Sequence, residues 1–150
     1  MVKDWEYYKQ LYLQQKIDET KRWFQLIESF LESPIERIAF MYLIKAANEN
    51  FPPMALRIEE QFRVGPYKVD FMVIHRDTDT YIAIECDGHE FHEKTKEQAA
   101  RDKKRDRYLA KKGIIVLRYT GSQICSNPME IYNDVCQIIL DRKYARSGRG

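Results

Sequence analysis

Residues 81–92 read Tyr-Ile-Ala-Ile-Glu-Cys-Asp-Gly-His-Glu-Phe-His, and this stretch decides how the rest of the chain is interpreted. Its apolar run ends at Glu85 and Asp87 and is followed by a glycine and two histidines. A second apolar run at 69–74 carries one acid, Asp70. A carboxylate among hydrophobic residues is costly to bury unless it is paired or binds a metal. Because hard cations such as magnesium select oxygen ligands, the acids predict a magnesium site and metal-assisted chemistry on a phosphate.

The pattern of apolar and breaker residues outward from this stretch predicts an α/β fold. Three strands are expected at 56–63, 67–75 and 80–86, then a helix at 93–112, a strand at 114–119 and a helix at 128–142. A crossover between the strands that flank 93–112 gives a mixed four-stranded sheet flanked by helices. Ser33 and Pro34 predict the start of a helix that runs to about Asn50.

A long helix is expected before this core, at residues 4–31. Apolar side chains recur on one face of it at helical spacing, and core packing is the usual reason for such a stripe, although it can also cover a partner or mediate dimerisation. The stripe consists of Trp5, Tyr8, Tyr12, Ile17, Phe24, Ile27 and Leu31.

Composition limits the class of protein. Of the 150 residues 44% are hydrophobic and 32% charged, which suits one soluble domain with an extra element. No apolar run approaches the roughly 18 residues of a membrane helix, and the acidic, aromatic start does not resemble a secretory signal, so we expect a cytoplasmic protein without membrane partners. The three cysteines, Cys86, Cys125 and Cys136, form no Cys-x-x-Cys pair, so free thiols are favoured over structural zinc.

Positive charge is concentrated in the segment 93–112. It holds nine basic and four acidic residues, whereas the whole chain carries a net charge of only +2. Such clusters attract phosphate backbones regardless of sequence, and the alternative is an ordinary solvated helix face. We expect DNA as the partner and contacts from the following residues: Lys94, Lys96, Gln98, Arg101, Lys103, Lys104 and Arg105.

The candidate site centres on the acids. Glu85 and Asp87 are two apart, so a strand turns both to one face, and Asp70 reaches that face if the strand register allows. The alternatives are a tight turn at Asp87-Gly88 and a surface salt bridge for Asp70. His89 and His92 are candidate general bases, or loop histidines exposed to water.

The next helix adds two candidates. Gln98 and Asp102 are four apart and share a helix face that can look back at the acids.

Taken together, these motifs resemble the very-short-patch-repair (Vsr)-like branch of the PD-(D/E)XK nuclease superfamily, over residues 33–141. The motifs are Glu36, Asp70, Glu85-Cys86-Asp87-Gly88, His92, Arg101-Asp102 and the run 113–118. The resemblance implies a restriction-endonuclease-like core, preceded by a helical extension at 1–32 and followed by a basic flexible tail at 142–150. It also implies a DNA endonuclease that uses magnesium or manganese and acts in repair, homing or defence.

The resemblance further implies a role for each matching residue. Asp70, Glu85 and the carbonyl of Cys86 would hold the metal, and His92 would act near the scissile phosphate. Asp102, with Gln98, would orient that histidine or a water, and Glu36 would reach the site from its helix.

Asp87 stands where most of the superfamily has a lysine, and the zinc-binding cysteines of Vsr enzymes are absent. A catalytically inactive nucleic-acid-binding module on the same fold is therefore the alternative, and a homodimer or a larger specificity partner can complete the protein. A third hypothesis is an interaction protein that works through its N-terminal helix.

Overall fold

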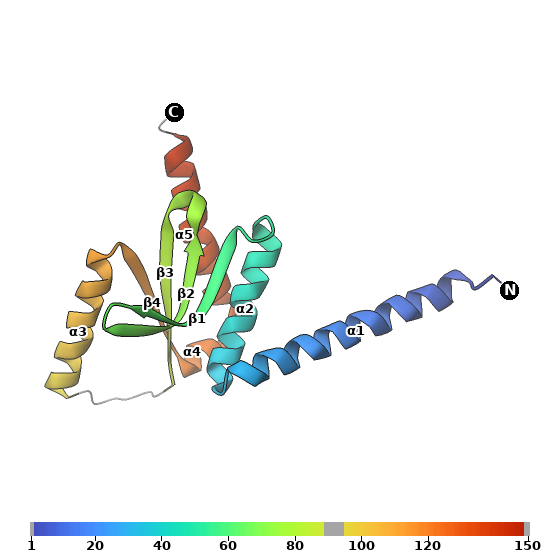
Figure 1. Ribbon diagram of the computed structural model, residues 1–150, viewed down its shortest axis with the longest axis horizontal. Coiled ribbons are helices and arrows are strands. Elements are labelled where there is room, and N and C mark those ends of the chain that lie inside the picture. Colours follow the sequence, from blue (N-terminus) through green and yellow to red (C-terminus); the bar gives the residue numbers. More distant parts are fainter. Residues whose placement is uncertain (1, 89–94, 149–150) are drawn as a thin grey trace.

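A computed structural model describes residues 2–88 and 95–148 of the chain (Figure 1). The order of elements is two helices, three strands, a helix, a strand and two helices. The helices are α1 Trp5–Phe30, α2 Pro34–Asn50, α3 Lys96–Lys111, α4 Gly121–Ser126 and α5 Met129–Ser147. The strands are β1 Leu56–Val64, β2 Tyr67–His75, β3 Thr80–Asp87 and β4 Ile114–Thr120. In the described part of the chain, no helix is long and apolar enough to cross a bilayer.

The four strands form one mixed sheet in the order β1-β2-β3-β4. The first three are antiparallel neighbours, and β4 returns parallel to β3 after α3. A parallel return needs a crossover segment, which α3 supplies. The predicted α/β fold with a mixed, four-stranded, helix-flanked sheet is therefore confirmed.

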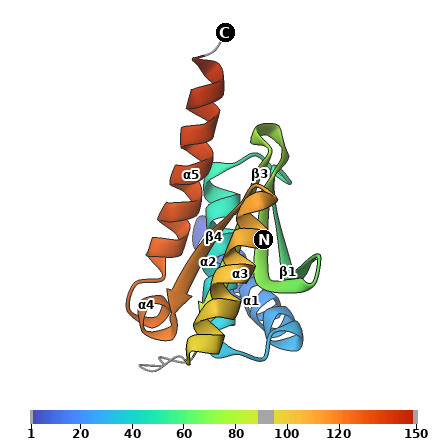
Figure 2. The same cartoon turned by 90° about the vertical axis from the view of Figure 1, so that its left-hand side faces the viewer.

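Alternation along the strands divides the core into two layers. Phe71, Val73, Ile82 and Ile84 point to the side of α2 and α5, whereas Met72 and Ala83 point to α3. Figures 1 and 2 show α3 on one side of the sheet and α2 and α5 on the other. Because both faces of the central strands are covered, β2 and β3 read as nearly continuous apolar runs.

This alternation breaks at Asp70. Val69 packs in the α3 layer although its neighbour Phe71, two positions on, lies in the α2 layer. On β1, Gln61 lies between the registered pairs Glu60↔Phe71 and Phe62↔Val69, which places it opposite Asp70, and its φ is 49°. A non-glycine residue in the left-handed region costs about 1 kcal/mol or more, so surrounding structure must hold it there. The irregularity turns the tip of the β1–β2 hairpin toward α3 and leaves Asp70 at the bend.

Local signals explain the ends of the helices around the site. The hydroxyl of Ser33 accepts from the backbone N–H of Glu36 at 3.5 Å, and Pro34 takes the first turn, as predicted. Thr95 and Gln98 form a reciprocal capping box that starts α3.

Three expectations need correction. The last helix does not end near residue 142 but continues to Ser147, so residues 142–147 are helical and not a flexible tail. The short helix α4 was not predicted. The apolar stripe of α1 is mostly uncovered: Ile27 and Leu31 are buried, whereas Trp5 is 75% and Tyr12 59% exposed. Figure 1 shows α1 extending away from the remainder of the molecule.

Candidate active site

Asp70 is anchored to the end of β3. Its Oδ2 accepts a hydrogen bond of 2.7 Å from the backbone N–H of Cys86. The last registered pair of β2 with β3 is Phe71↔Ile84, so Asp70 falls level with Glu85. The register therefore brings the two acids together, as the sequence predicted. The surface salt bridge considered for Asp70 is not what positions its Oδ2.

Glu85 lies on the α3 side of the sheet and is paired with a cation. Its Oε1 accepts from Nη2 of Arg105, and its side chain is only 13% exposed. The same Nη2 donates to the carbonyl oxygen of Lys68 at 3.0 Å. Burial raises the pKa of Glu85 to about 7; the Arg105 charge and hydrogen bond oppose that rise, and Asp70 adds to it. Glu85 is therefore a carboxyl group poised to exchange a proton near neutral pH.

Glu36 approaches the same acids from α2. Its Oε1 accepts from Nε2 of Gln61 at 3.1 Å. Burial, and then the nearby Asp70, raise the pKa of Glu36 above its usual value. Since Asp70 raises the pKa of both glutamates, three carboxyl groups share one electrostatic environment, and such a group favours a bound cation.

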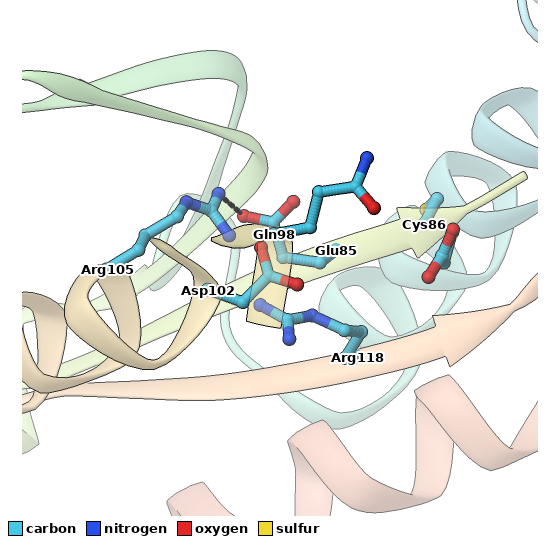
Figure 3. A pocket seen from close by; sticks show the side chains of 7 residues that line it. Glu85, Cys86, Gln98, Asp102, Arg105 and Arg118 are labelled. Atoms are coloured by element: carbon cyan, nitrogen blue, oxygen red, sulfur yellow. Dashed lines mark hydrogen bonds and ion pairs between the residues drawn. The ribbon is translucent and has the colours of Figure 1, made fainter. Parts of the chain in front are cut away.

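An open pocket of about 310 Å³ lies between the sheet and α3. In Figure 3, Gln98, Asp102 and Arg105 reach from α3 toward Glu85 on β3 and Arg118 on β4. This confirms the expectation that the Gln98–Asp102 face looks back at the acids. The pocket is lined by Glu85, Cys86, Asp87, Gln98, Asp102, Arg105 and Arg118. It is chemically suited to an anion beside carboxylates, because two guanidinium groups and the acids line one space.

The predicted DNA contacts differ in their surroundings. The side chains of Lys96, Arg101, Lys103 and Lys104 are exposed on α3, where a backbone phosphate can meet them. Arg105 is instead half-buried against Glu85. His89, His92 and Lys94 lie outside the described residues, so their roles stay predictions.

Two residues of the site had no role predicted from the sequence, although Arg118 belongs to the matched run 113–118. Arg118 follows the apolar run of β4 and donates to Oδ1 of Asp106 at 3.0 Å. Its place at the end of a predicted buried strand, level with Glu85, was the available signal. Gln61 had no signal, because a left-handed residue inside a strand cannot be read from a glutamine.

The carboxylates of the site are candidate ligands for a metal ion. Within residues 2–88 and 95–148, no group of three or more His, Cys, Asp or Glu side chains is arranged to hold an ion. Magnesium, however, is commonly held by one or two carboxylates with waters and substrate phosphate. Asp70 and Glu85 supply two such carboxylates at neighbouring positions, so the chemistry of the donors fits a magnesium ion of this open kind.

The chain was compared with known proteins. A family model, REase_MTES_1575, matches residues 49–139, from the end of α2 into α5. The match includes Asp70, Glu85, Asp87 and Asp102, and excludes Glu36 and α1. It describes restriction-endonuclease-like proteins and does not single out the Vsr-like branch. No curated protein matches the chain.

Proposed function

Because the chain belongs to the restriction-endonuclease-like family REase_MTES_1575, we propose that it is a metal-dependent DNA endonuclease that hydrolyses phosphodiester bonds. One observation carries the proposal: the Asp70 carboxylate is hydrogen-bonded to the backbone of β3, and Glu85 of that strand lines a pocket with two arginines. Carboxylates beside guanidinium groups suit a reaction in which a cation and a phosphate meet.

Asp70 and Glu85, with the carbonyl oxygen of Cys86, are the residues proposed to hold magnesium or manganese. A bound ion of this kind polarises a phosphate oxygen and makes a water more nucleophilic. To serve as a ligand, Glu85 must be ionised and must loosen its pair with Arg105. The pKa of about 7 therefore predicts that metal affinity rises through neutral pH.

Arg105 and Arg118 are proposed to replace the lysine that most of the superfamily carries where this chain has Asp87. Both reach the pocket, one from α3 and one from β4 (Figure 3). When Glu85 turns to a metal, the guanidinium of Arg105 becomes available to a phosphate oxygen. A guanidinium can bind phosphate through two parallel hydrogen bonds and remains charged at every working pH.

DNA is proposed to lie along α3. The exposed cations Lys96, Arg101, Lys103 and Lys104 belong to the same helix as the pocket residues Gln98 and Asp102. Contacts of this kind neutralise backbone phosphates, position the duplex and carry no base specificity.

The biological setting is part of the proposal. We favour the Vsr-like branch on the motifs that run from Glu85 to Asp102, with His92 near the scissile phosphate and Glu36 in support from α2. Repair, homing and defence are the roles compatible with such an enzyme. A specificity partner can supply target choice.

A catalytically inactive DNA-binding module is the second candidate, and one observation favours it. Glu85 is paired with Arg105, and Asp87 occupies the position of the usual lysine. If that pair never opens, the protein binds DNA and does not cut it.

Incubation of the protein with supercoiled plasmid, in magnesium, in manganese and in chelator, tests the proposal. We expect metal-dependent nicking that is lost in Asp70→Asn and in Glu85→Gln. The matched control is Asp141→Asn, which changes an exposed acid on α5 and keeps full activity. DNA binding without cleavage in either metal, by wild type as well as variants, would establish the inactive module instead.

A further inference from the structure

Helix α1 exposes an unusual amount of apolar surface for a helix attached to a folded core. Of its 26 residues only Ile27 is buried, and Figure 1 shows it projecting from the body. Its exposed side chains include Trp5 at 75%, Tyr8 at 56%, Tyr12 at 59% and Leu26 at 59%. An exposed apolar patch of this size marks an interaction surface.

The charge of this helix argues against a nucleic-acid partner. Residues 1–31 contain five basic and five acidic side chains, so the segment is neutral, in contrast to the basic α3. A helix that binds anionic lipid or a phosphate backbone carries a basic polar face. The partner of α1 is therefore expected to be a protein.

Three pairs of residues on one face of α1 are symmetric about the middle of the helix. Positions that recur at steps of three or four share a helix face. Along this face, apolar residues occupy both ends and a Lys-Glu pair occupies the middle. This self-pairing face differs from the apolar stripe predicted from the sequence, and its symmetric pairs are Trp5 with Phe30, Tyr12 with Trp23 and Lys16 with Glu19. The self-pairing face consists of Trp5, Tyr8, Tyr12, Lys16, Glu19, Trp23, Leu26 and Phe30. A two-fold axis pairs a surface with itself. An antiparallel pair of identical helices therefore requires residues that are symmetric about the middle of the helix.

We propose that α1 pairs antiparallel with α1 of a second copy of this chain and makes the protein a homodimer. The two-fold axis lies between residues 17 and 18. Trp5 of one copy then lies over Phe30 of the second copy, and Tyr12 over Trp23. Lys16 lies against Glu19 of the second copy, twice, and each chain already joins these two residues at 2.9 Å.

A surface hollow beside α1 is available to a side chain of the second copy. A hollow of about 380 Å³ lies between α1 and α2, and three of its six lining side chains are apolar. It is lined by Thr20, Trp23, Met41, Ile44, Lys45 and Asn48. In the antiparallel register, the ring of Tyr12 from the second copy lies over Trp23 at the edge of this hollow.

The available area matches that of a stable dimer. A helix of this length spans about 39 Å, so the pair can be continuous over the whole self-pairing face. At roughly 100 Å² for each of the seven exposed side chains of this face, with Trp23 half-buried, the pairing buries roughly 700 Å² per chain, within the range per partner of a standard-size interface. For the proposed nuclease, two-fold pairing places two sites in one particle.

Sedimentation equilibrium of the full chain tests the pairing. We expect a mass of about 36 kDa, twice the 18.0 kDa of one chain. Tyr12→Glu weakens the dimer by at least about a hundredfold, because each dimer loses two buried rings and gains two buried charges. The matched control is Ile17→Glu. Ile17 is similarly exposed, at 48%, but it lies five residues beyond Tyr12, about 140° around the helix, and therefore outside the self-pairing face. The control variant stays dimeric.

Charge exchange separates self-pairing from any other contact. Lys16→Glu and Glu19→Lys each place like charges opposite one another, and we expect each to weaken the dimer about tenfold or more. Mixing the two variants restores complementary pairs, so a heterodimer of wild-type affinity should form. A monomeric wild type, a dimer indifferent to Tyr12→Glu, or a mixture no tighter than its two components would each overturn the proposal. The readout is mass, so it is independent of nuclease activity.

Discussion

Replacing Glu85 with glutamine should make the protein more stable at high pH and leave its stability almost unchanged at low pH. Burial raises the pKa of Glu85 from 4.5 to about 7 in the folded protein. The neutral carboxyl group is therefore the form that the fold favours. Its contribution to stability is complete below about pH 4.5 and is lost as the pH rises through about 7.

The size of this effect follows from the shift. One unit of pKa corresponds to about 1.4 kcal/mol, so the free energy of unfolding of the wild type should fall, through this group, by about 2 to 3 kcal/mol between pH 5 and pH 8. Glutamine cannot ionise and keeps the shape of the side chain. Glu85→Gln should match the wild type at pH 5 and exceed its free energy of unfolding by about 2 to 3 kcal/mol at pH 8.

Urea unfolding followed by far-ultraviolet circular dichroism measures the difference. Tryptophan fluorescence is less suitable, because both tryptophans, Trp5 and Trp23, belong to α1. Glu60→Gln is the control, since its side chain is exposed, and we expect the same small effect at both pH values. A Glu85→Gln protein that is less stable than the wild type at pH 8 would show instead that the ion pair with Arg105 outweighs burial, and the predicted pH dependence would be wrong.

Three further predictions concern packing and reactivity. Gly65→Ala should lower the free energy of unfolding by about 2 kcal/mol or more, because Gly65 has a φ of 57° and a Cβ there meets the Tyr108 hydroxyl; an unchanged urea midpoint would contradict this. Tyr119→Phe should cost about 1 to 2 kcal/mol in the same assay, since it removes the 2.7 Å hydrogen bond to the Asp134 carboxylate, and a neutral result would count against that bond. A thiol reagent should modify Cys125 quickly and the other two cysteines slowly, because Cys125 is exposed and burial raises the pKa of the other thiols; three equal rates would exclude this.

Most of the fold could be predicted from the sequence because local signals agree with it. The apolar runs around Asp70 and Glu85 have the length and flanks of buried strands, with Asp70 inside β2 and Glu85 near the end of β3. The approach of Asp70 to Glu85 depended on the register of the two strands, which the sequence left open and the structure supplies. The 4–31 helix was predicted from its apolar periodicity and the 33–50 helix from its start at Ser33 and Pro34, and both were found.

The features that the sequence did not predict depend on distances between elements and on backbone conformations that no local sequence pattern encodes. A long side chain such as Arg105 can bind DNA or fold back on Glu85, and only the distance between α3 and the sheet decides between them. The bend at Gln61 uses a backbone conformation that glutamine rarely adopts. For α1, periodicity identifies the apolar face but does not say whether the same chain covers it, which is why core packing was expected and exposure was found.

Binding of Mn²⁺ to the protein, followed by electron paramagnetic resonance of the free ion, probes the proposed metal site without requiring DNA cleavage. The account predicts that the wild type binds the ion at pH 8 and binds it more weakly at pH 6, where Glu85 is largely protonated. Asp70→Asn should bind it at neither pH, while Asp141→Asn binds like the wild type. Equal binding by wild type and Asp70→Asn, or none by the wild type at pH 8, would contradict a metal site built on Asp70 and Glu85.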